Sequence, residues 1–104
     1  MLAIPLLAVP SQILNVSLAN QAVQLAVYQK LSGLYMDVYV NNSLIIGGVI
    51  CENINRIVRS VYLGFIGDLL FYDNQGSEDP VYTGLGNRFS LIYLETTDLP
   101  NGVG

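Results

Sequence analysis

The residues that could carry chemistry in this sequence are mainly carboxylates, because the chain contains no histidine. Without an imidazole there is no Ser-His-Asp or Cys-His nucleophilic site, and the usual zinc ligand sets are incomplete. Asp37 lies between two tyrosines in an alternating segment and Glu95 ends another, so a buried pair could act as general acid and base. The simpler interpretation places them on polar outer faces of a sheet. We therefore expect no catalytic residues and no enzyme.

Two further motifs suggest ligand chemistry only weakly. Oxygen side chains stand at every second position of the loop Asp73, Gln75, Ser77 and Asp79, but the glycine and the closing bidentate glutamate of a calcium loop are missing. Gly84-Leu85-Gly86 lacks the third glycine and the following helix of a phosphate-binding motif. We interpret the first as a solvated acidic loop and the second as a turn, and we expect no metal and no cofactor.

Cys51 is the single cysteine, so no disulfide can form within the chain. It ends an apolar run and has no histidine to activate it, which indicates a buried small side chain rather than a reactive thiol.

The composition argues for a partner protein. Residues of the set AVILMFWYC make up 52% of the 104 residues and charged residues only 12%, about half the usual charged fraction. The mean hydropathy is +0.48. A small domain has much surface to cover, and with few charges part of that surface is expected to be covered by other protein chains.

The same numbers argue against two other classes of partner. The net charge is −4 and the only bases are Lys30, Arg56, Arg59 and Arg88, so we expect no nucleic-acid binding. The longest dense apolar stretch, Leu44 to Cys51, is far shorter than the roughly 18 residues of a membrane span. The apolar start, Met1 to Val9, lacks a basic leader and is broken by Pro5, so we expect no signal peptide and no membrane insertion.

The dominant sequence period is two, which predicts strands. The strands predicted from this period are 3–7, 11–18, 23–30, 34–40, 43–51, a segment from Val61 onward, 68–72 and 88–95. Leu31-Ser32-Gly33 and Asn41-Asn42 are expected to form tight turns, and Ser43 to Cys51 to be a central strand buried on both sides. Glu52 to Ser60 is ambiguous, with a helical turn as one alternative.

This pattern predicts one all-β domain over residues 1–104, a small antiparallel β-sandwich or barrel of about six to eight strands. Residues 96–104 are predicted to be a flexible tail, and 73–80 an exposed loop.

Tyr28, Tyr35 and Tyr39 fall on the polar sides of their predicted strands, with Asp37 between the last two. Tyrosine buries a large ring while its hydroxyl stays wet, so it suits protein interfaces. We predict that Tyr28, Tyr35, Asp37 and Tyr39 form an interface. Ordinary strand propensity is the alternative explanation of these tyrosines.

The order of motifs resembles a known family. The motifs are Leu31 to Asn41, Leu44 to Gly48, Asn53 to Val58, Gly67 to Phe71, an acidic loop with Pro80, and Gly84 to Glu95. This order resembles the small baseplate plug proteins of contractile-tailed bacteriophages over roughly Val23 to Glu95. The resemblance implies a structural virion protein, assembled in the host cytoplasm, that helps to close the end of the tail tube beside the hub and spike.

As partners, the resemblance implies hub, spike or tail-tube proteins, and copies of the chain itself. The symmetry of tail spikes suggests a trimer. It implies no active site. The rival hypothesis from another class is a small ligand- or carbohydrate-binding β domain, in which Tyr35 and Tyr39 form a stacking platform.

Overall fold

The computed structural model describes residues 2–59 and 65–95. Within them the chain forms seven strands and one short 3-10 helix, η2. The elements are β1 (Leu2–Ile4), β2 (Ser11–Leu18), β3 (Gln21–Lys30), β4 (Gly33–Val40), β5 (Ser43–Ile50), β6 (Asp68–Asp73), η2 (Tyr82–Gly84) and β7 (Phe89–Leu94). None of the described residues forms a helix long and apolar enough to cross a membrane.

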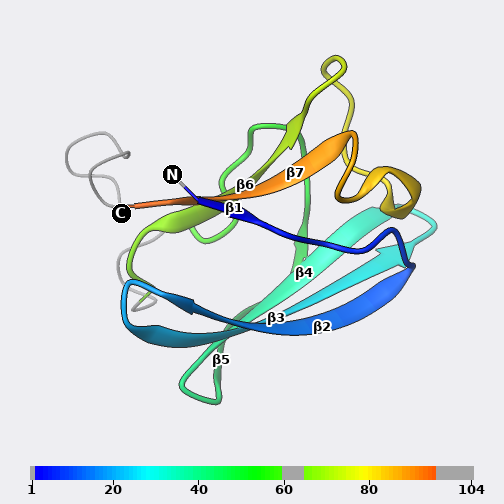
Figure 1. Cartoon of the computed structure of the whole chain (residues 1–104). Helices are drawn as coiled ribbons and strands as arrows, with labels where there is room; N and C mark the ends of the chain where they lie inside the picture. The colour runs from blue at the N-terminus through cyan, green and yellow to red at the C-terminus, as the bar shows by residue number, and fades with distance from the viewer. Residues whose placement is uncertain (1, 60–64, 96–104) are drawn as a thin grey trace.

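The strands form two antiparallel sheets that face each other (Figure 1). One has the order β1-β7-β6 and the other the order β2-β3-β4-β5. The prediction of a small antiparallel all-β fold is confirmed, with the sandwich as the form adopted. The tail predicted over 96–104 and the strand start predicted at 61–64 lie outside the described residues.

Tight turns shape the four-stranded sheet. Asn41 and Asn42 have φ values of 51° and 67°, and Ala19 and Asn20 have 49° and 62°. Two successive left-handed residues are typical of the type I′ turn, whose twist matches that of the flanking strands. The Asn41-Asn42 turn is as predicted. Nothing in the sequence marked the Ala19 turn, because alanine seldom adopts positive φ.

The prediction that Ser43 to Cys51 is a central strand buried on both sides is wrong. β5 is an edge strand that pairs only with β4 among the described elements, and Leu44 and Ile50 are 56% and 39% exposed. A continuous apolar run is compatible with a buried central strand and with an apolar edge. Gly47 and Gly48 were the signal against a central strand, because glycine inside a strand often marks a bulge.

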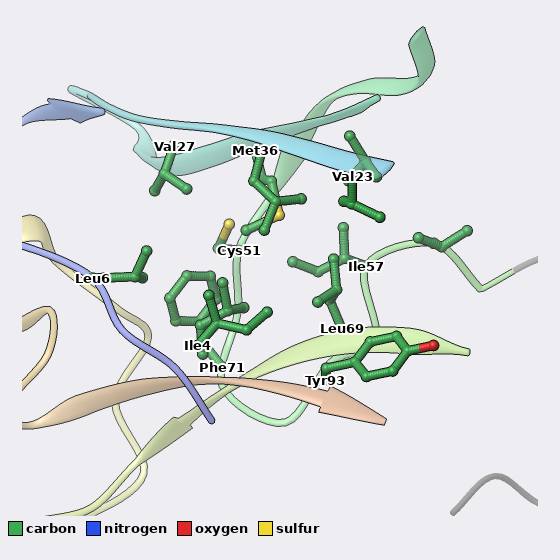
Figure 2. Packing of buried hydrophobic residues seen from close by; sticks show 14 of the residues in the cluster. Ile4, Leu6, Val23, Val27, Met36, Cys51, Ile57, Leu69, Phe71 and Tyr93 are labelled. Atoms are coloured by element: carbon green, nitrogen blue, oxygen red, sulfur yellow. The ribbon is translucent and has the colours of Figure 1, made fainter. Parts of the chain in front are cut away.

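The core lies between the two sheets and consists of the inward side chains of both (Figure 2). Its fully buried members include Leu25, Val27, Met36 and Val38 from one sheet and Leu69, Phe71 and Leu91 from the other. Cys51 is 2% exposed, which confirms that it is a buried small side chain. Full burial of one such aliphatic or aromatic side chain contributes roughly 1.5–3 kcal/mol.

The segment after β5 crosses to the other sheet without forming a helix. Asn53 makes a parallel bridge to Phe71, and Ile57 and Val58 are buried in the core. The carboxylate of Asp68 accepts hydrogen bonds from the backbone N–H groups of Val58 and Arg59, both at 2.8 Å. The isoleucine and valine residues whose spacing suggested a helical turn therefore belong to an irregular segment, which crosses from one sheet to the other and packs onto the core.

The N-terminal segment folds back on its own domain. β1 is an edge strand paired with β7 and ends before Pro5, somewhat earlier than predicted. Ile4 and Leu6 are buried. The side-chain amide of Gln12 donates to the Leu7 carbonyl at 2.7 Å and accepts from the Leu7 N–H at 3.1 Å.

Candidate protein interface

The outer side of the four-stranded sheet carries the predicted interface residues. Leu25, Val27, Leu34, Met36 and Val38 point into the core, and side chains alternate along a strand. The residues between them therefore point outward. Tyr28, Tyr35, Asp37 and Tyr39 all lie on this side and are partly exposed. We call the outward side chains of β2 to β5 the tyrosine face, and these four residues all belong to it.

Asp37 is the hydrogen-bonding centre of the tyrosine face. Its Oδ1 accepts from the Tyr28 hydroxyl at 2.9 Å and from the Gly48 backbone N–H at 2.7 Å. The pairing of β4 with β5 shifts register between Met36 and Val38, so Asp37 faces a bulge that contains Gly48. Burial, and secondly the hydrogen bond to Asp37, raise the pKa of Tyr28 above its ordinary value.

Tyr28 and Tyr35 are directly opposite each other on neighbouring strands. Their rings are stacked, with centroids 6.1 Å apart and planes 17° from parallel. The Tyr35 hydroxyl shares a hydrogen bond with Ser32 Oγ at 2.7 Å, and Lys30 Nζ lies 5.5 and 5.7 Å from the two ring centroids. These contacts hold both rings in one orientation, which lowers the entropy lost when a partner packs on them.

Exposed aliphatic side chains surround the tyrosines. Ile13 is 66% exposed and Leu44 56%. The register places Ser11, Tyr28, Tyr35 and Ile50 in one row across the sheet, and Asn15, Gln24, Tyr39 and Leu44 in another. Sequence reasoning did not include the aliphatic residues in the interface, since it placed residues 43–51 in the interior.

The two carboxylates of the enzyme hypothesis are not brought together. Asp37 lies on β4 and faces away from the other sheet, whereas Glu95 directly follows β7 in that other sheet. Asp37 is also already engaged by Tyr28 and Gly48. A general acid and base acting on one substrate must both reach it, so this arrangement does not support the pair.

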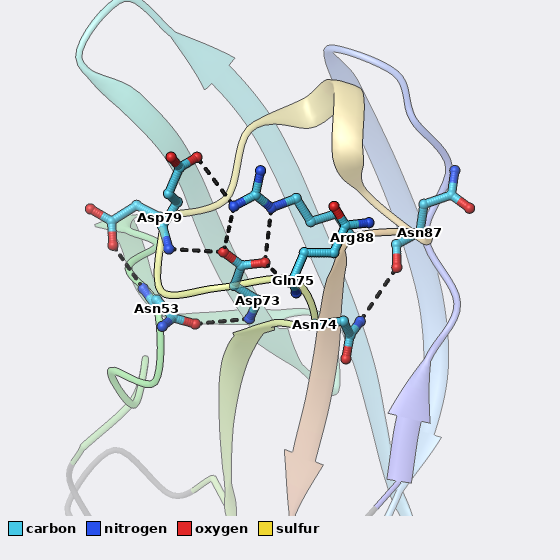
Figure 3. A network of polar contacts seen from close by, with 8 residues as sticks. Asn53, Asp73, Asn74, Gln75, Asp79, Asn87 and Arg88 are labelled. Carbon is cyan, nitrogen blue, oxygen red and sulfur yellow. Dashed lines mark hydrogen bonds and ion pairs between the residues drawn. The ribbon is translucent and has the colours of Figure 1, made fainter.

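The acidic loop is held by a network centred on Asp73 (Figure 3). Arg88 donates to both oxygens of Asp73, from Nε at 2.9 Å and from a terminal nitrogen at 2.8 Å. The N–H groups of Gln75 and Glu78 donate to the same carboxylate at 2.9 and 2.8 Å. The Arg88 guanidinium holds the pKa of Asp73 well below its usual range.

The prediction of an exposed loop over 73–80 is therefore wrong for Asp73, which is 2% exposed, and for Pro80, which is buried, although the residues from Asn74 to Asp79 are exposed as predicted. A bidentate pair with arginine and two backbone donors occupies the lone pairs that a cation would need. Within the described ranges, no group of three or more acidic or cysteine side chains could hold a metal ion.

The remaining features are a glycine-containing turn and a small surface hollow. Gly84 ends η2, and Leu85 and Gly86 lie in the turn that leads to β7, with Gly86 at a φ of 82°; the predicted turn before the last strand is present. A hollow of about 100 Å³ lies beside the start of β3, lined by Asn15, Ala22, Val23, Gln24 and Asn42. Sites for small molecules usually measure about 300–1,000 Å³, so this hollow is small for a ligand.

The fold and its outer face define a small all-β module with one sheet face that carries tyrosines and exposed aliphatic side chains. Residues 1–97 match the family described as cyanophage baseplate Pam3 plug gp18. The chain therefore belongs to this family of phage baseplate plug proteins, as the order of its motifs indicated. A baseplate plug is a component of the virion tail. None of the curated proteins matches the chain.

Proposed function

We propose that this protein packs against hub, spike or tail-tube proteins through its tyrosine face and thereby helps to close the end of the tail tube. Family membership supplies the location in the baseplate. The observation that supports the contact surface is the face itself, where Tyr28 and Tyr35 are stacked beside exposed Ile13, Leu44 and Ile50.

The chemistry of the face suits a protein partner. Interface cores are enriched in tyrosine and depleted in charged residues, and the outward side chains of β2 to β5 include only Lys30 and Asp37 as charges. Both are already engaged, Lys30 over the tyrosine rings and Asp37 with Tyr28 and Gly48. These contacts offset part of the cost of covering the two charges with a partner.

The proposed role is structural and not catalytic. The Asp37 carboxylate accepts a hydrogen bond from Gly48 in the bulge of β5, and the Asp73 carboxylate accepts one from Glu78 in the acidic loop. The chain is proposed to work with copies of itself around the tail axis, and the symmetry of tail spikes suggests three copies.

The alternative, a carbohydrate platform of Tyr35 and Tyr39, gains no support from the geometry. Tyr35 is stacked on Tyr28, and the hollow described above lies elsewhere, between β2, β3 and the Asn42 turn. A glycan array discriminates the two proposals, because specific glycan binding that is lost in Tyr39→Ala would favour the platform.

The experiment is complementation of a phage that lacks this chain with matched tyrosine variants. Tyr39→Lys places a charge on the tyrosine face, and Tyr72→Lys places one on β6 in the other sheet, where Tyr72 is 47% exposed. We expect Tyr39→Lys to be lost from purified tails and Tyr72→Lys to be incorporated, with equal thermal stability of the isolated proteins. Equal incorporation of both variants would overturn the assignment of the face.

A further inference from the structure

We infer that neighbouring copies of this chain join edge to edge, β2 of one copy pairing with β5 of the next, so that a closed ring forms around the tail axis. The inference rests on the proposed function, which supplies the axis, and it concerns the edges of the same sheet, where Ile13, Leu44 and Ile50 lie. The tyrosine face contacts other proteins, whereas the two edges of the four-stranded sheet contact the same protein.

The β2 edge is open and regular. Leu18 and Gln21 close a two-residue turn, and the Gln29 N–H donates to the Pro10 carbonyl at 2.8 Å. Hydrogen-bonded and non-hydrogen-bonded pairs alternate along an antiparallel ladder, so every second residue turns its backbone groups away from β3. These residues are Ser11, Ile13, Asn15 and Ser17.

This edge also lacks the usual protection. Monomeric sheets guard their edges with charges, proline, bulges or very short strands. β2 is eight residues long, contains no charge and no proline, and pairs with β3 without a bulge. An open edge of this kind favours pairing with another strand.

The β5 edge complements it. β5 is also eight residues long and contains no charge. The Cys51 N–H donates to the Leu34 carbonyl at 2.7 Å, and Val40 pairs with Ser43 beside the Asn41-Asn42 turn. By the same alternation, Leu44 and Ile50 turn their backbone groups outward. The bulge between them bends the strand, and bulges provide the curvature that closes barrels.

Strand direction allows a second copy in head-to-tail orientation to occupy each edge. Successive strands of the sheet are antiparallel, so β2 and β5 run in opposite directions. A copy rotated about an axis to which the strands are tilted presents its β2 antiparallel to β5 and continues the sheet. A two-fold contact would pair β2 with β2 or β5 with β5 and leave the other edge open, whereas a head-to-tail ring covers both.

Side-chain positions agree with this pairing. Ser11 shares a row with Ile50, and Asn15 shares a row with Leu44. Closing a sheet into a ring requires the register to stagger from copy to copy, which brings Ile13 of one copy near Leu44 or Ile50 of its neighbour. These three exposed aliphatic side chains would then cover one another, as cross-strand pairs do.

Cross-linking in assembled tails tests the contact. Phages carrying Asn15→Cys, Leu44→Cys or both are treated with a short bis-maleimide. Cys51 is buried and does not compete. We expect no cross-linked product from either single variant, and from the double variant a covalent ladder that ends at a fixed copy number. A dimer from a single variant would show a two-fold contact and overturn the inference.

The outcomes separate this inference from the proposed function. Tails that contain the double variant but yield no cross-links would overturn the ring alone. Tails of the wild-type phage that lack the chain would overturn both proposals.

A backbone variant provides a second measurement. Asn15→Pro removes an N–H that points away from β3, so the pairing of β2 with β3 is kept. We expect Asn15→Pro to be absent from tails and Asn15→Ala to be present, with similar urea midpoints for the two isolated proteins. Equal incorporation of the two variants would contradict edge pairing.

Discussion

The Tyr28 hydroxyl donates a hydrogen bond to Asp37 at 2.9 Å, and this contact connects β3 to the bulge in β5, because Asp37 also accepts from Gly48 at 2.7 Å. The Tyr28 hydroxyl and the Gly48 N–H are therefore both held by the carboxylate of Asp37.

Asp37→Ala is predicted to lower the free energy of unfolding by about 1–2 kcal/mol, because it removes an acceptor from two donors at once. Tyr28→Phe removes one donor and is predicted to cost less. Urea unfolding of the two variants measures the difference. An Asp37→Ala protein with the wild-type urea midpoint would contradict the role of Asp37 in holding the bulge.

The lowered pKa of Asp73 predicts that the fold loses stability in acid. Because Arg88 lowers the pKa of Asp73 in the folded protein, this carboxylate stabilises the fold above its unfolded-state pKa of about 3.8. That stability is lost as the pH falls below about 4, through the lower folded pKa. Asp73→Asn is predicted to flatten the dependence of unfolding free energy on pH in this range.

Asp79→Asn is the matched control for this prediction, since it alters a neighbouring carboxylate that binds the Asn53 N–H and leaves Asp73 and Arg88 in place. It should leave the contribution of the Asp73–Arg88 pair to the slope below pH 4 in place. If Asp73→Asn kept the wild-type slope, the network around Asp73 would not be the source of the acid sensitivity.

Cys51 is predicted to be inert in the folded protein. Burial raises the pKa of its thiol to about 12, and the thiolate is the reactive form. A maleimide or Ellman reagent at pH 8 should label the protein in urea but not the native protein. Rapid labelling under native conditions would show that the core opens around Cys51.

Gly86 is predicted to be intolerant of a side chain. It has a φ of 82°, and a Cβ there would collide with the backbone carbonyl of Leu6. Gly86→Ala should cost about 1–3 kcal/mol of stability and loosen the N-terminal segment. Gly76→Ala is the control, because the atoms nearest its Cβ are 3.4 Å or more away. Thermal unfolding of the pair tests this, and equal melting temperatures would contradict it.

The alternation of apolar and polar residues was enough to predict the hairpin of β3 and β4 and the shared face of Tyr28, Tyr35, Asp37 and Tyr39. This works because the direction of a side chain in a strand depends only on its position modulo two. The edge position of β5 was missed, since strand order depends on long-range pairing that an apolar run does not encode, and Gly47 and Gly48 were the only local sign of it. Asp73 was misjudged for the same reason, because its partner Arg88 is 15 residues away.

The most direct test of the central claim is to determine the protein composition of purified virions and the density at the end of their tail tubes by electron cryomicroscopy. The account predicts that this chain is present in fixed ratio to hub, spike or tube proteins and that its tyrosine face is covered by one of them. Virions that lack the chain, or that hold it with an uncovered tyrosine face, would contradict the account.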